Sequence, residues 1–420
     1  MKKRIAVDHL ESGMYVESLA VDWSDPLIRD RDTGAIQEQC VLSSQHEVDA
    51  IIAFGVTEVI IDTDKGKDVT VSPTAGVAES LAAQLEELGV PQIAGNSSAA
   101  RNERSPLIRA ATIKDHAREV IGESLEAARL GKPTQLTPVR DSVKQITDSL
   151  FEDPDALLSF SMLKRRDDYT FMHSLNVGVL MVAFCQAEGV SEDKLIDAGV
   201  GGMLHDIGKM RLPQSLLTVQ GRLSEEQTAK IRQHVVLGRR HLERSPGISE
   251  TTLQIVSEHH ERLDGSGYPN GLKGDAISPL GQMTAIVDVY DAITSDTTYH
   301  QAQAPNQALQ RMMALSKQEL NGTLFQRFVR TVGIYPLGSL VQLENGLIGV
   351  VIAANRESLL HPVITVVKDS TTRKNVEPRR IDLMEYKGKE EGRYEIQGQV
   401  SSRKWGIDPR QYMPMPALFA

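Results

Sequence analysis

The sequence predicts a mainly α-helical protein, with a small α/β unit before the helices and a small β unit after them. From residue 111 onward apolar residues recur every three to four positions, as in Ile113, Ala117 and Val120, which is the period of a helix. Beyond residue 336 apolar and polar residues alternate instead, and Asn345-Gly346 is a strong hairpin signal. The fold should therefore be helical at its centre and contain strands at both ends.

Segments of different character divide the chain of 420 residues. Residues 1–72 should form an N-terminal α/β accessory domain, because short strands flank a helix that begins near Ser43 or Ser44. A packing or dimerising role for this unit is at least as good an interpretation as a regulatory one. The other expected segments are a linker at 73–110, the main helical domain at 111–335, a small β appendage at 336–390 and an extended tail at 391–420.

Capping residues mark where several helices should begin. Ser224 and Gln227 have the spacing of a capping box ahead of the helix expected to carry His234. Ser278-Pro279 should begin the helix that carries Asp288, with proline at its tolerated first position.

Composition argues against several classes of protein. The net charge of −10 is unlike that of a general nucleic-acid binder, which would present a basic surface. Only two cysteines occur, Cys40 and Cys185, so neither a disulfide framework nor a thiolate metal site is expected. The N-terminus lacks the apolar stretch of a signal peptide, and no run of about 18 apolar residues occurs. We therefore expect a cytoplasmic protein without a membrane span.

Histidines and aspartates recur in the expected helices. The stretch His259–Asp275, HHERLDGSGYPNGLKGD, follows an apolar run, and a second doublet, His205-Asp206, lies upstream. Taken singly, a helical histidine is more often a hydrogen-bonded structural residue than a ligand. Asp288 is harder to explain in that way, because it lies in an apolar segment where an unpaired buried carboxylate would be costly. So many imidazole and carboxylate groups suggest a metal site built from several helices.

Several motifs carry a family resemblance. HDIGK, the spaced histidines, HHERLDGSGYPNGL and IVDVYDAITSD resemble the HD-GYP domain, a branch of the HD superfamily of phosphohydrolases, over roughly residues 110–335. This resemblance implies a helical HD-type bundle with a binuclear metal site. It also implies a bacterial phosphodiesterase that opens cyclic di-GMP to linear pGpG, with GMP as the alternative end product. Small α/β units similar to residues 1–72 often precede such domains.

The resemblance also implies a set of metal ligands. These are His173, His205, Asp206, His234, His259, His260 and Asp288. Asp206 would bridge two divalent ions, with His173, His205 and Asp288 completing one site and the other histidines completing the second. Nitrogen and carboxylate ligands without thiolate suit iron or manganese, which the family favours, with zinc as an alternative. Two such ions sharing a water would lower its pKa and hold the phosphate.

Lys209 lies three residues after Asp206, so both side chains would share one face of a helix. Its family role is to contact a phosphate oxygen or the attacking water, whereas the alternative is a solvated lysine paired with an exposed acid. His241, seven residues after His234, matches no family ligand and is left out of the site.

The loop Gly267-Tyr268-Pro269 should bend sharply, since closely spaced glycines permit positive φ and proline stiffens the turn. In the family this loop lies near the site and is linked to partner contacts, although a purely structural turn is an equal alternative. Arg262 and Lys273 could supply charge for a phosphate or could be ordinary surface residues.

Two departures from the family pattern affect these expectations. Tyr169 stands where trinuclear members carry a glutamate one turn before the first histidine, so we expect two metal ions per chain. Residues 296–300, DTTYH, replace a segment that is basic in many members, which removes cations expected near the substrate.

Three functions remain open from the sequence. The first is an active cyclic di-GMP phosphodiesterase. The second is a weakly active or inactive metal-loaded module that binds cyclic di-GMP or a diguanylate cyclase (GGDEF) partner. The third is a hydrolase of another nucleotide, and assembly as a homodimer is left open in each case.

Overall fold

The computed structural model describes the chain except for a few segments. The described residues are 2–7, 10–21, 38–53, 56–68, 104–152, 169–219, 223–295, 302–355, 358–389, 393–400 and 402–412. Most of the expected linker at 73–110 lies outside them. Its last part was expected wrongly, because helix α3 already begins at Arg104.

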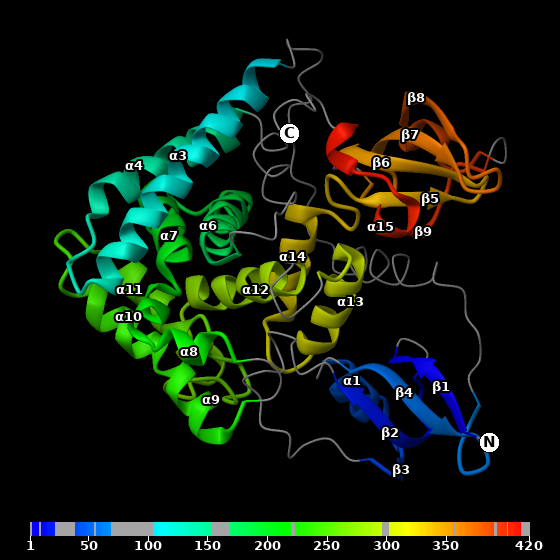
Figure 1. The fold of residues 1–420 in the computed structure, drawn as a ribbon, viewed down its shortest axis with the longest axis horizontal. Helices are drawn as coiled ribbons and strands as arrows, with labels where there is room; N and C mark the ends of the chain where they lie inside the picture. Colours follow the sequence, from blue (N-terminus) through cyan, green and yellow to red (C-terminus); the bar gives the residue numbers. More distant parts are fainter. Residues whose placement is uncertain are drawn as a thin grey trace.

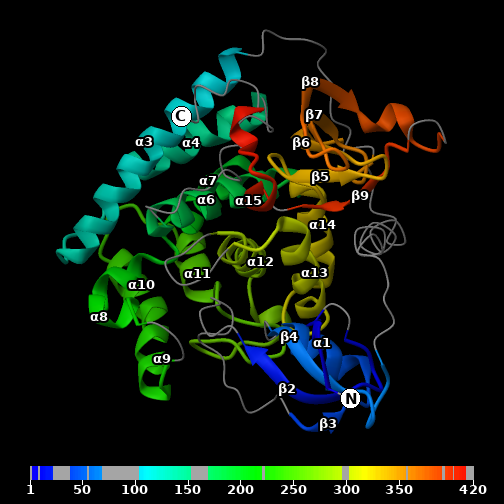
Figure 2. The same cartoon turned by 45° about the vertical axis from the view of Figure 1, so that its right-hand side comes forward.

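The described residues of the N-terminal unit form a four-stranded antiparallel sheet and helix α1 (Gln45–Ala53), consistent with the short strands and the helix that the sequence predicts. Its strands lie in the order β1 (Lys2–Ala6), β4 (Val56–Asp62), β2 (Tyr15–Val21) and β3 (Cys40–Val41). Helix α1 (Gln45–Ala53) contacts both β4 and helix α13 (Pro305–Leu315), so it joins this unit to the helical body (Figures 1 and 2).

Polar contacts from α1 reach the turn that follows α13. Lys317 pairs with Asp49, and Nε2 of Gln318 lies 3.1 Å from Nδ1 of His46. The backbone N–H of Leu263 in turn donates to the carbonyl of Glu319 at 2.9 Å. The N-terminal unit therefore touches a turn that is itself hydrogen bonded to the loop after His260.

Helices make up the centre of the molecule. In chain order they are α3 (Arg104–Arg129), α4 (Leu136–Glu152), α6 (Tyr169–Ala187), α7 (Glu192–Leu204), η4 (Ile207–Arg211), α8 (Gln214–Leu217), α9 (Glu225–Arg232), α10 (His234–Leu242), α11 (Glu250–Glu258), η5 (Gly274–Ala276), α12 (Pro279–Ile293), α13 and α14 (Gly322–Val332). The predicted apolar stripe of α4 is confirmed, because Val139, Val143, Ile146 and Leu150 are all fully buried.

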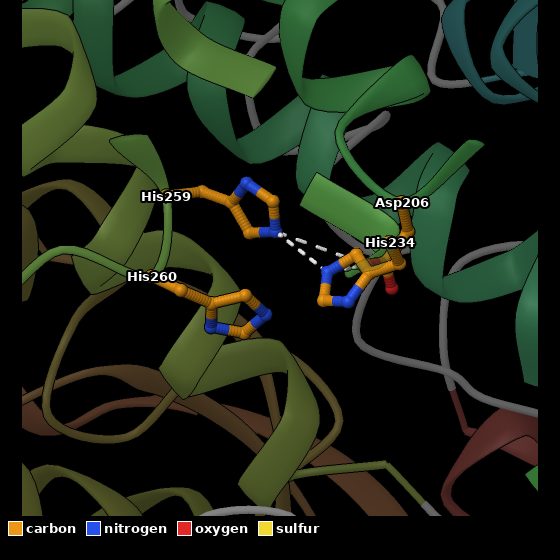
Figure 3. A group of neighbouring side chains, drawn as sticks. All are labelled: Asp206, His234, His259 and His260. Atoms are coloured by element: carbon orange, nitrogen blue, oxygen red, sulfur yellow. Dashed lines mark hydrogen bonds and ion pairs between the residues drawn. The ribbon is translucent and has the colours of Figure 1, made fainter. Parts of the chain in front are cut away.

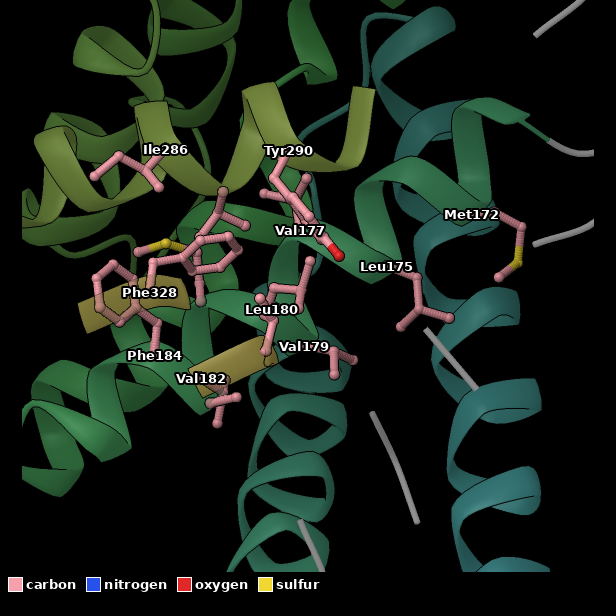
Figure 4. Close-up of a cluster of buried hydrophobic side chains, with 14 of the residues drawn as sticks. Met172, Leu175, Val177, Val179, Leu180, Val182, Phe184, Ile286, Tyr290 and Phe328 are labelled. Atoms are coloured by element: carbon pink, nitrogen blue, oxygen red, sulfur yellow. The ribbon is translucent and has the colours of Figure 1, made fainter. Parts of the chain in front are cut away.

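Helix α12 lies at the middle of this body and contacts α6, α11, α13 and α14. Nearly all of its side chains are buried, so it is surrounded by other helices rather than lying on a surface. Below it, Phe328 of α14 packs edge-to-face against Tyr290 and Phe184, with ring centroids 5.2 and 5.4 Å away (Figure 4). This packing fixes the position of the helix that carries Asp288.

The predicted caps form, with one correction. Ser224 and Gln227 make the reciprocal hydrogen bonds of a capping box, and the Ser278 hydroxyl accepts from the N–H of Gly281. The helix that begins after Ser224 does not run on through His234, however. It ends at Arg232, and His234 begins the separate helix α10.

The C-terminal part is a five-stranded antiparallel sheet whose core is continuous with that of the helices. Its strands lie in the order β8 (Asn375–Asp382), β7 (Val363–Asp369), β6 (Leu347–Ala353), β5 (Leu340–Leu343) and β9 (Ile396–Gln399). The predicted hairpin joins β5 to β6, with Gly346 at φ +83°.

The expected extended tail at 391–420 was wrong in part. Strand β9 pairs with β5, and the short elements α15 (Ser402–Trp405) and η7 (Pro409–Gln411) follow it. Another short turn, η6 (Leu383–Tyr386), follows β8. No helix among the described residues is long and apolar enough to cross a membrane.

Candidate metal centre

The candidate ligands come from separate helices and meet in the interior. His173 lies on α6 and Asp288 on α12, while His205 and His259 are the C-terminal caps of α7 and α11. Asp206 directly precedes η4, His234 begins α10, and His260 follows His259 in the next turn. All of them are buried except His260, which is half-buried. The tertiary fold therefore brings together every residue that the sequence predicts as a ligand.

Asp206 lies between two groups of histidines, each able to hold a metal ion. Its Oδ1 atom is 3.2 Å from Nε2 of His234 and 3.8 Å from Nε2 of His259 (Figure 3). Its Oδ2 atom is 3.5 Å from Nε2 of His205 and 3.8 Å from Nε2 of His173. One carboxylate thus presents a different oxygen to each group.

Asp288 adds a second carboxylate on the side of His173 and His205. Its Oδ1 atom is 3.1 Å from Nε2 of His173 and 3.5 Å from Nε2 of His205. His260 belongs to the other side, where its ring centroid is 5.1 Å from that of His234 and 4.2 Å from that of His259.

Hydrogen bonds at Nδ1 fix the tautomers of most of these histidines. Nδ1 of His205, His234 and His259 lies 2.8 to 2.9 Å from the backbone carbonyls of Gly202, Ile231 and Val256. A carbonyl only accepts, so each Nδ1 carries the proton and each neutral ring turns the lone pair of Nε2 inward.

This arrangement fits a cation. Nε2 of His234 and Nε2 of His259 are 3.4 Å apart, so in the neutral rings two lone pairs face each other across a buried space. A positive ion between them removes that repulsion, and a hydrogen bond from Nδ1 to a carbonyl is the usual outer support of a histidine ligand. The residues present therefore fit a divalent metal.

The electrostatics of the cluster support the same conclusion. Burial, followed by the neighbouring imidazoles, lowers the pKa of His259 and His260 well below its ordinary value, so both rings are neutral at pH 7. Burial raises the pKa of Asp206, but Lys209 and His205 outweigh it and hold that pKa well below the ordinary value. Neutral nitrogens and an ionised carboxylate are the ligand forms that divalent metals bind.

The pKa of His205 is raised by the negative charge around it. Burial lowers the pKa of its imidazole, but the adjacent Asp206 and Asp288 outweigh burial and raise that pKa to about 10. The two carboxylates therefore favour positive charge at this position, which a divalent metal ion would supply.

Lys209 contacts the cluster, but not through the continuous helix that its spacing predicts. Helix α7 ends at Leu204, and Ile207–Arg211 forms a 3₁₀ turn. Even so, Nζ of Lys209 lies 2.5 Å from Oδ2 of Asp206. Its side chain keeps 31% exposure, so Lys209 links the buried carboxylate to the partly exposed edge of the site.

The glycine-rich loop packs closely on the metal-binding turn. A Cβ at Gly267 would lie 2.5 Å from the carbonyl oxygen of His260, so only glycine fits there. Gly265 has φ +83°, and the exposed side chain of Lys273 lies along it. Pro269 is exposed at the tip of the loop.

Arg262 is committed at least in part to this loop. It donates to the backbone carbonyls of His259 and Glu261, at 3.2 and 2.9 Å. Both bonds come from one terminal nitrogen of the guanidinium, so that nitrogen supports the turn after His259.

The structure identifies three supporting carboxylates that the sequence interpretation missed. Asp291 Oδ2 lies 2.8 Å from Nδ1 of His173. Glu261, fully buried, accepts from the N–H groups of Asn270 and Leu272, and Glu258 accepts from Ser278 at the start of α12. A signal was present for Asp291, because it lies one helical turn after Asp288 in an otherwise apolar helix.

His241 is buried apart from this cluster, with Nε2 2.9 Å from Oγ1 of Thr134. The side chain of Tyr169, residues 167–168 and the segment 296–300 lie outside the described residues.

A helical bundle that directs histidines and aspartates from several helices to one centre is the architecture of an HD-type metal-dependent hydrolase. Residues 159–324 match the HD domain family, residues 2–139 match a domain of unknown function (DUF3391), and residues 340–388 match the KOW domain associated with HD domain. The matched ranges differ from the domain limits expected from the sequence. The division of the chain at those limits stays a prediction.

Several similar proteins are cyclic dinucleotide phosphodiesterases. A cyclic di-GMP phosphodiesterase of Pseudomonas aeruginosa is 35% identical over 91% of this chain and 89% of its own length. One of Thermotoga maritima is 33% identical over 44% of this chain and 50% of its own, and a 3′3′-cGAMP-specific phosphodiesterase of Vibrio cholerae is 32% identical over 42% and 41%. The chain belongs to the HD-GYP family of HD-domain proteins.

Proposed function

We propose that this protein hydrolyses cyclic di-GMP to linear pGpG, and further to GMP, with the help of two divalent metal ions. The observation that carries the proposal is the position of Asp206, which turns one carboxylate oxygen to each group of histidines. Support also comes from the cyclic di-GMP phosphodiesterase of Pseudomonas aeruginosa, which is similar over nearly the whole chain.

His173, His205 and Asp288 would hold one ion, His234, His259 and His260 the other, and Asp206 would join both. Histidine nitrogens and carboxylate oxygens without thiolate favour iron or manganese. Bound here, such ions would lower the pKa of an attacking water and neutralise charge on the phosphoryl oxygens.

Lys209 supplies a protein cation beside Asp206. Its Nζ atom donates to Oδ2 of Asp206, and its side chain is partly open to solvent, so a phosphate oxygen or the attacking water would approach from this side. In this proposal Lys209 and Asp206 carry the catalytic roles.

The loop beside the site would contact the rest of the dinucleotide. Tyr268 stacks on His260 with ring centroids 4.6 Å apart, which places the segment Gly267-Tyr268-Pro269 next to the metal ligands. Lys273 and Arg262 would add positive charge for the phosphates of the dinucleotide. The exposed tip of the same loop would meet a diguanylate cyclase partner. The homodimer and the cytoplasmic location also remain predictions.

The test combines metal analysis with chromatography of nucleotide products, on protein purified without oxygen. Asp206→Ala should lower the bound metal and abolish hydrolysis of cyclic di-GMP, whereas Asp193→Ala, which removes an exposed carboxylate of α7, should change neither. Full metal content with near-normal turnover in Asp206→Ala would refute the proposal.

Parallel assays with 3′3′-cGAMP address the substrate, because a relative specific for that nucleotide is 32% identical over 42% of this chain. Preferential hydrolysis of 3′3′-cGAMP would replace the substrate assignment. Wild-type protein that binds metal and cyclic di-GMP without measurable turnover would support the alternative of an inactive receptor module.

A further inference from the structure

His260 is held differently from the other histidines of the cluster. Nδ1 of His173, His205, His234 and His259 each lies within hydrogen-bond distance of an oxygen acceptor. In the part of the chain that the structure describes, neither ring nitrogen of His260 has such a bond. Something other than an N–H···O hydrogen bond must therefore set the orientation of this imidazole.

Tyr268 makes the stacked ring contact of this imidazole. The two rings are stacked, with centroids 4.6 Å apart and planes inclined by 25°. The backbone N–H of Tyr268 also donates to the carbonyl of His260 at 3.1 Å, and the absence of a side chain at Gly267 permits this approach. The plane of the phenol ring thus restricts the plane of the imidazole.

Arg232, the last residue of α9, packs on the same tyrosine. Its Cζ atom lies over the Tyr268 ring, 4.9 Å from the centroid. The guanidinium and the imidazole therefore both pack against the ring of Tyr268. A cation over the face of an aromatic ring is attracted by the ring quadrupole, and the attraction grows as water is excluded.

We propose that Arg232 is a positioning residue, which clamps Tyr268 against His260 and so fixes the one histidine ligand that lacks an Nδ1 hydrogen bond. The inference rests on the metal site of the proposed function. Arg232 lies outside the histidine, aspartate and glycine motifs and acts without touching the metal or the nucleotide. The competing interpretation is that Arg232 only ties α9 to the loop.

The test is titration of metal-free protein with Mn²⁺ alone, followed calorimetrically and by the electron paramagnetic resonance of unbound Mn²⁺. Arg232→Ala should weaken one class of Mn²⁺ site ~10- to 100-fold, as expected for the loss of an outer support of a metal ligand. Arg232→Lys should restore most of the affinity because it keeps a cation over the ring. Arg240→Ala, which removes an exposed arginine of the next helix, is the matched control.

A second set of variants tests whether Arg232 acts through Tyr268. Tyr268→Phe keeps the ring and should bind Mn²⁺ like the wild type, whereas Tyr268→Ala should resemble Arg232→Ala. Adding Arg232→Ala to Tyr268→Ala should cost less than about twofold more, because residues that act as a unit are not additive. If Arg232→Ala does not fold, Arg232→Gln keeps the length of the side chain without its charge.

Two results would overturn the proposal. One is Mn²⁺ affinities of Arg232→Ala that lie within about twofold of those of Arg240→Ala. The other is a double variant in which Arg232→Ala weakens Mn²⁺ binding of Tyr268→Ala as much as it weakens that of the wild type. The titration contains no nucleotide. Wild-type protein that binds Mn²⁺ but leaves cyclic di-GMP intact would therefore refute the proposed function and not this inference.

Discussion

Nδ1 of His173 lies 2.8 Å from Oδ2 of Asp291, and both side chains are buried between α6 and α12. The carboxylate accepts the Nδ1 proton, which turns the lone pair of Nε2 toward Asp288 and Asp206. Asp291 thus accepts from Nδ1 of His173, as backbone carbonyls accept from Nδ1 of His205, His234 and His259.

Removing this support should weaken metal binding. Asp291→Ala should lower the affinity of the His173 side of the site ~10- to 100-fold, and Asp291→Asn, which keeps an acceptor without the charge, should lower it less. Metal titration of the two variants with circular dichroism as a folding control provides the measurement. If both variants bind the metal as tightly as the wild type, the hydrogen bond between Asp291 and His173 does not affect the metal affinity.

Lys209→Ala separates catalysis from metal binding. The variant should keep its metal, because the cluster supplies the ligands, but should lose about 10²-fold in kcat, as other positioned charges or proton donors do. The control is Lys194→Ala, which removes an exposed lysine of α7. Unchanged kinetics in Lys209→Ala would return the residue to the role of a solvated surface lysine.

The number of metal ions should be two per chain. Tyr169 occupies the position one turn before His173 and offers only a phenol, whose ordinary pKa of about 10 makes it a poor ligand at neutral pH. Elemental analysis after loading with excess iron or manganese and desalting gives the stoichiometry. A reproducible value near three would point to an added ligand, with Asp167 or Asp168 the first candidates.

His241 should make folding stability depend on pH. Burial, followed by Arg211 and Arg244, lowers the pKa of its imidazole, so the folded chain keeps it neutral where the unfolded chain begins to bind a proton. Its contribution is therefore present above the unfolded pKa of about 6.5 and is lost as the pH falls through that value.

The measurement is denaturant unfolding of metal-free protein between pH 7.5 and 5, compared with His241→Asn. The free energy of unfolding of the wild type should fall more steeply than that of the variant, by at most about 1.4 kcal/mol per pH unit. If the free energies of unfolding of the wild type and of His241→Asn fall equally with pH, His241 has the same pKa in the folded and the unfolded chain.

The packing below α12 should be important for stability. Phe328 is fully buried against Phe184 and Tyr290, so Phe328→Ala should lower the free energy of unfolding by about 3–5 kcal/mol. Phe151→Ala, at a side chain that is 62% exposed, should change it by no more than about 0.5 kcal/mol. A loss below about 1 kcal/mol for Phe328→Ala would contradict the described packing.

The sequence by itself determined the local features of this protein. The buried stripe of α4, the capping box of Ser224 and Gln227, and the hairpin at Gly346 follow from residues close together in the chain. The candidate ligands could be predicted because their motifs carry a family resemblance. Helical period, caps and turns depend on neighbours a few residues away, so one sequence is enough to predict them.

Only the tertiary structure decided how distant residues meet. Strand β9 joins the sheet next to β5, and the helix after Ser224 breaks before His234, because strand pairing and packing override local propensity. The division of the histidines between the oxygens of Asp206 and the clamp of Arg232 on Tyr268 also depend on helix packing. Their geometry is set by long-range contacts of α6, α7, α11 and α12, which no spacing in the sequence encodes.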